Sequence, residues 1–98
     1  MFTYLNKQGV RSNRGFDVQI TGRFSIEYRE NNRVLAIAWE AGRSNGKNAV
    51  LVDPSAFARW RDGTAITPQD QQRILSNFRE AIEFQNLELV VESGFPAG

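Results

Sequence analysis

The sequence contains no cysteine and no histidine, and these two absences exclude much chemistry at once. Without cysteine no disulfide can form, so the fold depends on packing alone, as is typical of cytoplasmic proteins. Without cysteine or histidine, catalysis by either of these side chains is excluded. A transition-metal site would have only carboxylates as strong ligands. We therefore expect no metal and no other cofactor.

Three further features are missing. No apolar stretch approaches the ~20 residues of a membrane-spanning helix, and the chain does not start like a secretory signal. The glycine-containing segment 42–46 lacks the Lys-Ser/Thr pair of a phosphate-binding loop. Glu27, Glu30 and Glu40 are the candidates for an acid–base carboxylate pair, but exposed strand glutamates usually form ion pairs. The sequence predicts a cytoplasmic protein without a membrane partner that is not an enzyme.

Charge is balanced overall but uneven along the chain. The 98 residues carry a net charge of +1. Residues 1–47 contain eight basic and four acidic side chains, whereas residues 48–98 contain four basic and seven acidic ones. Because the two halves of so small a chain interleave in space, a mixed surface is the simpler interpretation. A functional basic patch in the first half remains the alternative.

The strongest local pattern is an amphipathic helix over residues 66–86. Thr67 is a good N-cap, and Pro68 takes the first helical position, where its missing N–H costs nothing. One apolar stripe recurs at helical spacing, formed by Ile74, Leu75, Phe78, Ala81 and Ile82. Because a lone amphipathic helix is marginal in water, this one requires a sheet to pack on.

Alternating apolar residues predict strands at 16–20, 24–29 and 34–40. Asn31-Asn32 suits a two-residue turn, because asparagine tolerates positive φ. The register then pairs Glu30 with Arg33, Tyr28 with Leu35, Ile26 with Ile37 and Phe24 with Trp39. For the preceding hairpin, a three-residue loop over 21–23 is predicted, which pairs Ile20 with Phe24, Val18 with Ile26 and Phe16 with Tyr28.

Together these elements predict a single α+β domain over residues 1–98. Its antiparallel meander has about four strands, the fourth at 49–52 after a flexible loop over 42–46. A short helix follows Asp53-Pro54, the long amphipathic helix packs on one sheet face, and a closing strand spans 87–91. Residues 1–14 are predicted to be a loose segment, with a short edge strand at its start, 15–92 the core, and 93–98 a tail.

The order of several residues resembles a known family. Tyr28 and Glu30 lie in one predicted strand, and Glu40 ends the next. An isolated tryptophan, Trp60, follows, and residues 66–70 open the helix. This order, over roughly residues 15–92, is similar to small α+β immunity proteins of bacterial polymorphic toxin systems. The resemblance implies a non-enzymatic protein that neutralises a cognate toxin by stoichiometric binding. Because the net charge is near zero, that toxin need not be a basic nuclease.

Partner contacts are predicted at exposed strand ends and loops, with Arg29, Arg33, Glu40, Arg43 and Asp62 as the candidates. The sheet face away from the helix forms a flat patch that suits a partner or a homodimer, and it shows Ser25, Glu27, Arg29, Val34, Ala36 and Ala38. The alternative function is a small nucleic-acid-binding domain that uses basic strand ends and loops. The predicted register buries Phe24, Tyr28 and Trp39, which leaves few aromatics for base stacking. Trp60 is predicted to close the core between the two helices rather than to serve a binding site.

Overall fold

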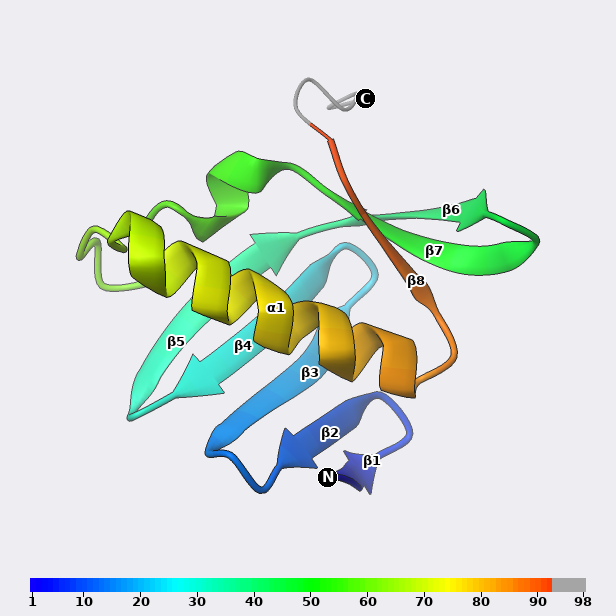
Figure 1. The fold of residues 1–98 in the computed structure, drawn as a ribbon, viewed down its shortest axis with the longest axis horizontal. Helices are drawn as coiled ribbons and strands as arrows, with labels where there is room; N and C mark the ends of the chain where they lie inside the picture. The colour runs from blue at the N-terminus through cyan, green and yellow to red at the C-terminus, as the bar shows by residue number, and fades with distance from the viewer. Residues whose placement is uncertain (93–98) are drawn as a thin grey trace.

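A computed structural model, which describes residues 1–92, has an α+β architecture with two sheets and one long helix (Figure 1). The larger sheet is an antiparallel meander in chain order, β1 (Phe2–Asn6), β2 (Gly9–Ser12), β3 (Phe16–Gly22), β4 (Ser25–Glu30) and β5 (Arg33–Ala38). The smaller sheet has the order β6 (Glu40–Ser44), β7 (Lys47–Val52) and β8 (Glu88–Val91). A short 3₁₀ helix, η1 (Pro54–Phe57), and the long helix, α1 (Pro68–Phe84), connect β7 to β8.

Helix α1 begins as predicted and lies over one face of the larger sheet (Figure 1). The Thr67 hydroxyl accepts a hydrogen bond from the Asp70 N–H at 3.1 Å, so the cap satisfies one free amide of the first turn. The buried stripe consists of Ile74, Phe78, Ala81 and Ile82. It packs against the inner side chains of β3, β4 and β5, and this contact forms the core of the protein.

The predicted β4–β5 register is confirmed. Tyr28 pairs with Leu35, Ile26 with Ile37 and Glu30 with Arg33. Asn31 and Asn32 form the turn with φ angles of 51° and 64°, the positive values that a two-residue hairpin turn needs. Turn chemistry and side-chain alternation therefore agree on a single register, and Tyr28, Ile26, Leu35 and Ile37 are all buried.

The predicted β3–β4 register is wrong by two residues. Ile20 pairs with Ile26 rather than with Phe24, and a bulge separates this pair from the pair of Gly22 and Ser25. A slip of two residues keeps every side chain on the same face of the sheet, so alternation alone cannot detect it. As a consequence Phe24 stands in the turn and is 58% exposed, not buried.

The first 14 residues are not a loose segment. They form the β1–β2 hairpin, which extends the sheet beyond β3, and within it Val10 is fully buried. The ring of Phe2 packs edge-on against Phe16 with centroids 5.7 Å apart. The short edge strand predicted at the start is present as β1, whereas β2 has only four residues, too few for alternation to reveal it. The predicted tail, residues 93–98, lies outside the described residues.

A third correction concerns the end of the meander. The strand predicted over 34–40 ends at Ala38, and the chain then enters β6, so residues 42–46 form most of a strand and a tight turn rather than a flexible loop. Asn45 and Gly46 have φ angles of 51° and 78°, the same turn chemistry as at the β4–β5 turn. The predicted fourth strand, β7, therefore belongs to a separate sheet. Strand β8 joins it in parallel, because the chain returns through η1 and α1.

Candidate partner-binding surface around the β4–β5 turn

The β4–β5 turn projects between two hollows in the surface. The hollows have volumes of about 500 and 530 Å³, and Glu30, Asn31 and Arg33 line both. The first hollow extends to Arg11 and Asp17 of the neighbouring strands. The second hollow is closed by α1, through Asp70, Arg73 and Asn77. The turn thus places polar side chains of sheet and helix around two open concave surfaces.

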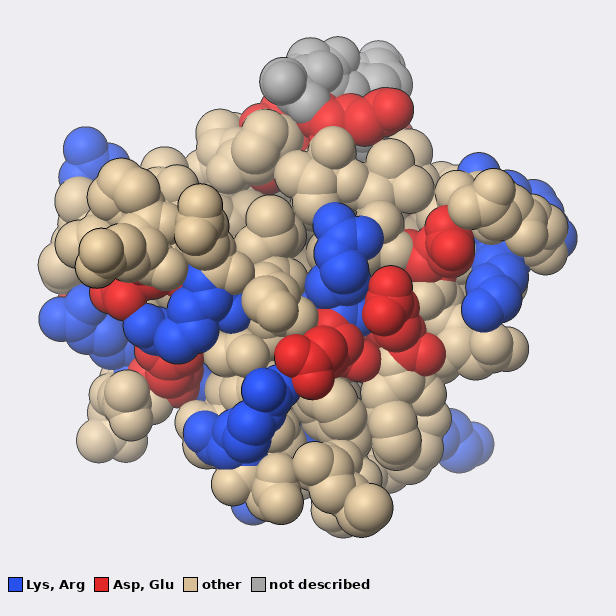
Figure 2. Space-filling view, in the orientation of Figure 1, with Lys and Arg blue, Asp and Glu red and all other residues tan. Residues whose placement is uncertain are grey.

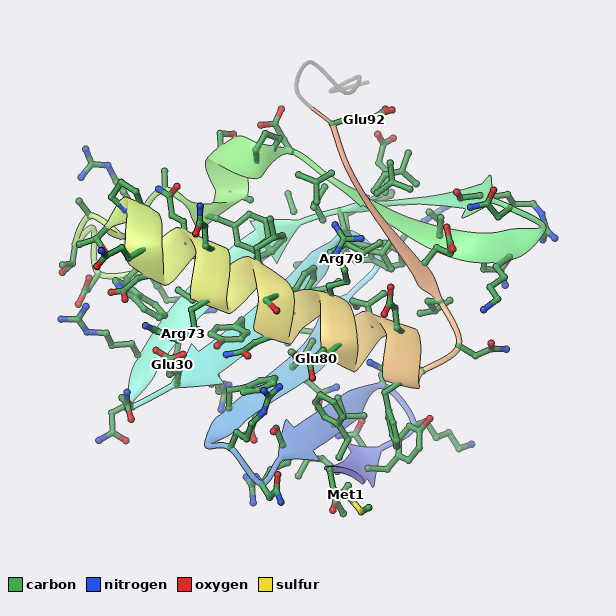
Figure 3. All side chains as sticks on the ribbon, in the orientation of Figure 1. Met1, Glu30, Arg73, Arg79, Glu80 and Glu92 are labelled. Carbon is green, nitrogen blue, oxygen red and sulfur yellow. The ribbon has the colours of Figure 1, made fainter. Side chains whose placement is uncertain are left out.

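A polar network ties the turn to the helix in the second hollow. The Tyr28 hydroxyl donates to Glu30 Oε1 at 2.7 Å and accepts from Asn77 Nδ2 at 3.0 Å. Arg73 donates to the other oxygen of Glu30, and its Nη1 donates to Asp70 Oδ1 at 2.6 Å. Figure 3 shows Glu30 and Arg73 pointing toward one another between the sheet and α1. Both carboxylate oxygens of Glu30 are therefore engaged.

The surroundings shift the pKa values of two groups in this network, the Tyr28 hydroxyl and the Arg73 guanidinium. Burial raises the pKa of the Tyr28 hydroxyl far above its ordinary value, so the phenol stays protonated at neutral pH. The hydrogen bond to Glu30 raises the pKa of Arg73, so the guanidinium stays charged. The hydrogen bonds of Tyr28, Glu30, Arg73 and Asn77 therefore join α1 to β4.

On the opposite face of β4, Glu27 holds two arginines. Arg29 Nη2 lies 2.6 Å from Glu27 Oε1, and Arg61 donates to the other oxygen. The Arg61 backbone N–H also donates to the Val34 carbonyl oxygen at 2.8 Å, so this residue fastens the loop after η1 to the edge of β5. Hydrogen bonds from Arg61 and then Arg29 lower the pKa of Glu27.

We expect Glu27→Gln to lower the free energy of unfolding at neutral pH but not in acid. A carboxylate whose pKa is depressed in the folded state stabilises the fold fully above its unfolded pKa, near the usual 4.5. That contribution is lost as the pH falls through the lower folded pKa. Urea unfolding of both proteins from neutral pH to below about pH 4 should show the difference shrinking. Glu83→Gln, at an exposed position of α1, is the control. A difference independent of pH would contradict this account.

Arg33 is held differently from the arginines beside it. Its guanidinium lies over the Trp60 ring, 5.6 Å from the centroid, and it has no hydrogen bond or ion pair with any residue between 1 and 92. Asp62 lies close by and accepts from the Thr64 N–H at 2.9 Å. The hydrogen bonds from Thr64, with a smaller contribution from the charge of Arg33, lower the pKa of Asp62. The N–H groups of Arg33 are thus free to meet an acceptor from outside.

A hollow of about 220 Å³ joins these groups, lined by Asn32, Arg33, Val34, Trp60, Arg61 and Asp62. We call these six residues the Arg33 surface. Trp60 is only 5% exposed and belongs to the core, as predicted, so it is a rigid support for the guanidinium above it. A guanidinium that rests on a buried ring, beside a carboxylate held by Thr64, is well suited to polar recognition.

The structure brings three of the five predicted contact residues together. Arg33 and Asp62 belong to the Arg33 surface, and Arg29 pairs with Val34 beside it. Glu40 and Arg43 lie apart from them, on β6 of the smaller sheet (Figure 1). Arg43 donates to Asn48 Oδ1 at 3.0 Å and to the Gly46 carbonyl oxygen at 2.9 Å, within its own hairpin. The prediction therefore combined two separate surfaces.

Sequence reasoning missed Arg61, Arg73 and Asn77 as part of this region. A signal for two of them was present, because Arg73 and Asn77 are four residues apart and so share one face of α1. Tyr28 and Glu30 are two residues apart and share one face of β4. For Arg61 there was no local signal, since its role depends on the path of a loop.

Figure 2 shows basic and acidic side chains interspersed on the face that carries α1, without an extended area of one sign. Within residues 1–92, no group of three or more acidic side chains is arranged to hold a metal ion. None of the helices in this part of the chain is long and apolar enough to cross a membrane. Comparison with protein families, with curated proteins and with solved structures found no match to this chain.

Proposed function

We propose that this is a non-enzymatic binding protein that neutralises a cognate toxin in the cytoplasm by stoichiometric contact through the Arg33 surface. One observation carries the binding site: Arg33 rests on the buried Trp60 with its N–H groups free, at the mouth of an open hollow. Arginine and tryptophan are enriched among the residues that dominate protein–protein binding energies. The toxin as partner follows from the family resemblance of the sequence.

The neighbouring ion pairs favour a protein partner over nucleic acid. Binding to nucleic acid gains affinity when free cations replace counterions along the phosphates. Most arginines around the turn are instead already paired with carboxylates, namely Arg11 with Asp17, Arg14 with Glu80, Arg29 and Arg61 with Glu27, and Arg73 with Glu30 and Asp70. Moving them onto phosphates would break these pairs.

We expect Arg33→Glu to weaken binding of the toxin domain encoded beside this gene by about 30-fold or more, as for a central contact worth about 2 kcal/mol. Arg43→Glu, on β6, makes the same charge change away from the Arg33 surface and should bind within a few-fold of the wild type. Calorimetric titration gives both the affinity and the one-to-one stoichiometry. Equal affinities for the two variants would contradict the assignment of the surface.

Binding to nucleic acid distinguishes the proposed function from its alternative. If the protein binds a toxin, we expect no measurable binding of the purified protein to generic single- or double-stranded DNA or RNA at physiological salt. Fluorescence anisotropy across a salt series is the measurement. Submicromolar binding that weakens by decades between about 50 and 200 mM salt would overturn the proposed function in favour of nucleic-acid binding.

A further inference from the structure

We propose that two copies of this chain associate by antiparallel pairing of their β1 strands. Strands β1 and β5 end the larger sheet, and β6 and β8 end the smaller one. Three of these edges are protected in ways that natural sheets use. Arg61 occupies the Val34 carbonyl on β5, Arg79 donates to the Leu89 carbonyl oxygen on β8 at 3.2 Å, and β6 carries Glu40 and Arg43. Strand β1, Phe2–Asn6, has no charged side chain.

The hydrogen-bond pattern shows which groups of β1 are free. The Asn13 N–H donates to the Met1 carbonyl oxygen at 3.1 Å, so residues 1 and 3 direct their backbone groups toward β2. Phe2 and Tyr4 therefore direct their N–H and C=O groups away from the sheet, and neither residue has a backbone partner on that side within residues 1–92. An edge with two such residues in succession matches another extended strand.

An aromatic patch lies along the same edge. The Phe84 ring, at the end of α1, lies 5.2 Å from the Phe2 ring and 5.3 Å from the Tyr4 ring between centroids. Tyr4 is 54% exposed and Phe84 42% exposed. Exposed aromatic rings beside an open strand edge give both apolar area and directional hydrogen bonds for an interface.

The geometry of this edge suits a second copy of the chain. A two-fold axis at Thr3 places Phe2 opposite Tyr4 of the other copy, which allows four backbone hydrogen bonds. Residues directly opposite share a sheet face, so the two aromatic patches meet on the helix side. Each Arg11 lies one strand behind β1, so the two would be about 14 Å apart, beyond the screening length of about 8 Å. The aromatic patch, formed by Phe2, Tyr4 and Phe84, thus meets itself without charged side chains in contact.

Sedimentation velocity of the full chain over a range of concentrations tests the pairing. We expect the mass to rise from 11.1 kDa toward twice that value as the concentration increases. Tyr4→Pro removes an outward N–H that the fold does not use, and Phe84→Glu places a charge in the patch. Each should weaken dimerisation about tenfold or more. Phe24→Glu changes an aromatic of similar exposure in the β3–β4 turn and should leave dimerisation unchanged.

Amide exchange measured by NMR distinguishes this interface from others. The Phe2 and Tyr4 amides should exchange slowly at high concentration and faster on dilution. A chain that stays monomeric at every concentration overturns the proposal, and so does a dimer in which these two amides exchange freely. Protection that appears only when the toxin domain is added would assign the β1 edge to that partner and overturn self-pairing. The Arg33 surface lies elsewhere, so its function is tested separately.

Discussion

Phe78→Ala is expected to reduce the free energy of unfolding by about 3–5 kcal/mol, which would leave the protein close to unfolding. Phe78 is fully buried at the centre of the α1 stripe, and its ring packs on Phe57 with centroids 5.8 Å apart. The truncation removes this contact and leaves a cavity between helix and sheet. A domain of this size has a total stability of about 5–10 kcal/mol, so the loss is a large part of it.

Urea unfolding monitored by tryptophan fluorescence measures this change. Phe24→Ala is the matched control, because Phe24 is exposed in a turn and should lose less than about 1 kcal/mol. The α1 stripe would not be the core if Phe78→Ala cost as little as the control.

Glu30→Ala is expected to cost about 1–3 kcal/mol by breaking the link between β4 and α1. Its carboxylate accepts from Tyr28 and Arg73, so the truncation leaves a buried hydroxyl with one partner fewer and a cation without its main acceptor. Glu30→Gln keeps an acceptor for the Tyr28 hydroxyl and should cost less. Urea unfolding of the three proteins provides the measurement, and wild-type stability of Glu30→Ala would show that the network is dispensable.

Elements whose signals are local could be predicted from the sequence. Thr67 and Pro68 set the start of α1 through the geometry of its first turn. The Asn31-Asn32 turn sets the β4–β5 register through positive φ angles and the alternation of the strands beside it. In each case a few adjacent residues contain all the physical information that the element needs.

Elements that depend on distant partners could not be predicted. Strand β2 is stable because it pairs with β3, and its alternation over four residues is too brief to detect. The β3–β4 slip leaves the buried face unchanged, so only the turn itself distinguishes the two registers. The separation of β7 and β8 into a second sheet follows from the path of the chain after Trp39, which no local pattern specifies.

The candidate site shows the same division. Arg29, Arg33 and Asp62 could be chosen because strand ends and loops are exposed, and the structure brings them together. Glu40 and Arg43 met the same criterion but lie on the other sheet. What distinguishes Arg33 is its position over Trp60, a contact between residues far apart in the sequence. That contact could be found only in the folded structure.

If the Arg33 surface binds the proposed partner, the ion pairs around the turn account for a specific surface on a nearly neutral protein. The arginines beside Arg33 are occupied in holding β4, α1 and the loop after η1 together. Their ion pairs therefore contribute to rigidity. The Arg33 guanidinium, by contrast, has no ion pair within residues 1–92. A rigid, preorganised surface loses little entropy on binding, which suits the stoichiometric binding proposed above.

Hydrogen exchange of the protein, free and in complex with the proposed toxin partner, tests partner binding through the Arg33 surface most directly. The complex should slow the exchange of amides in residues 30–34 and 60–64, while the β6–β7 hairpin, which carries Arg43, exchanges as in the free protein. Protection confined to that hairpin, or no protection anywhere in the chain, would contradict the proposed function.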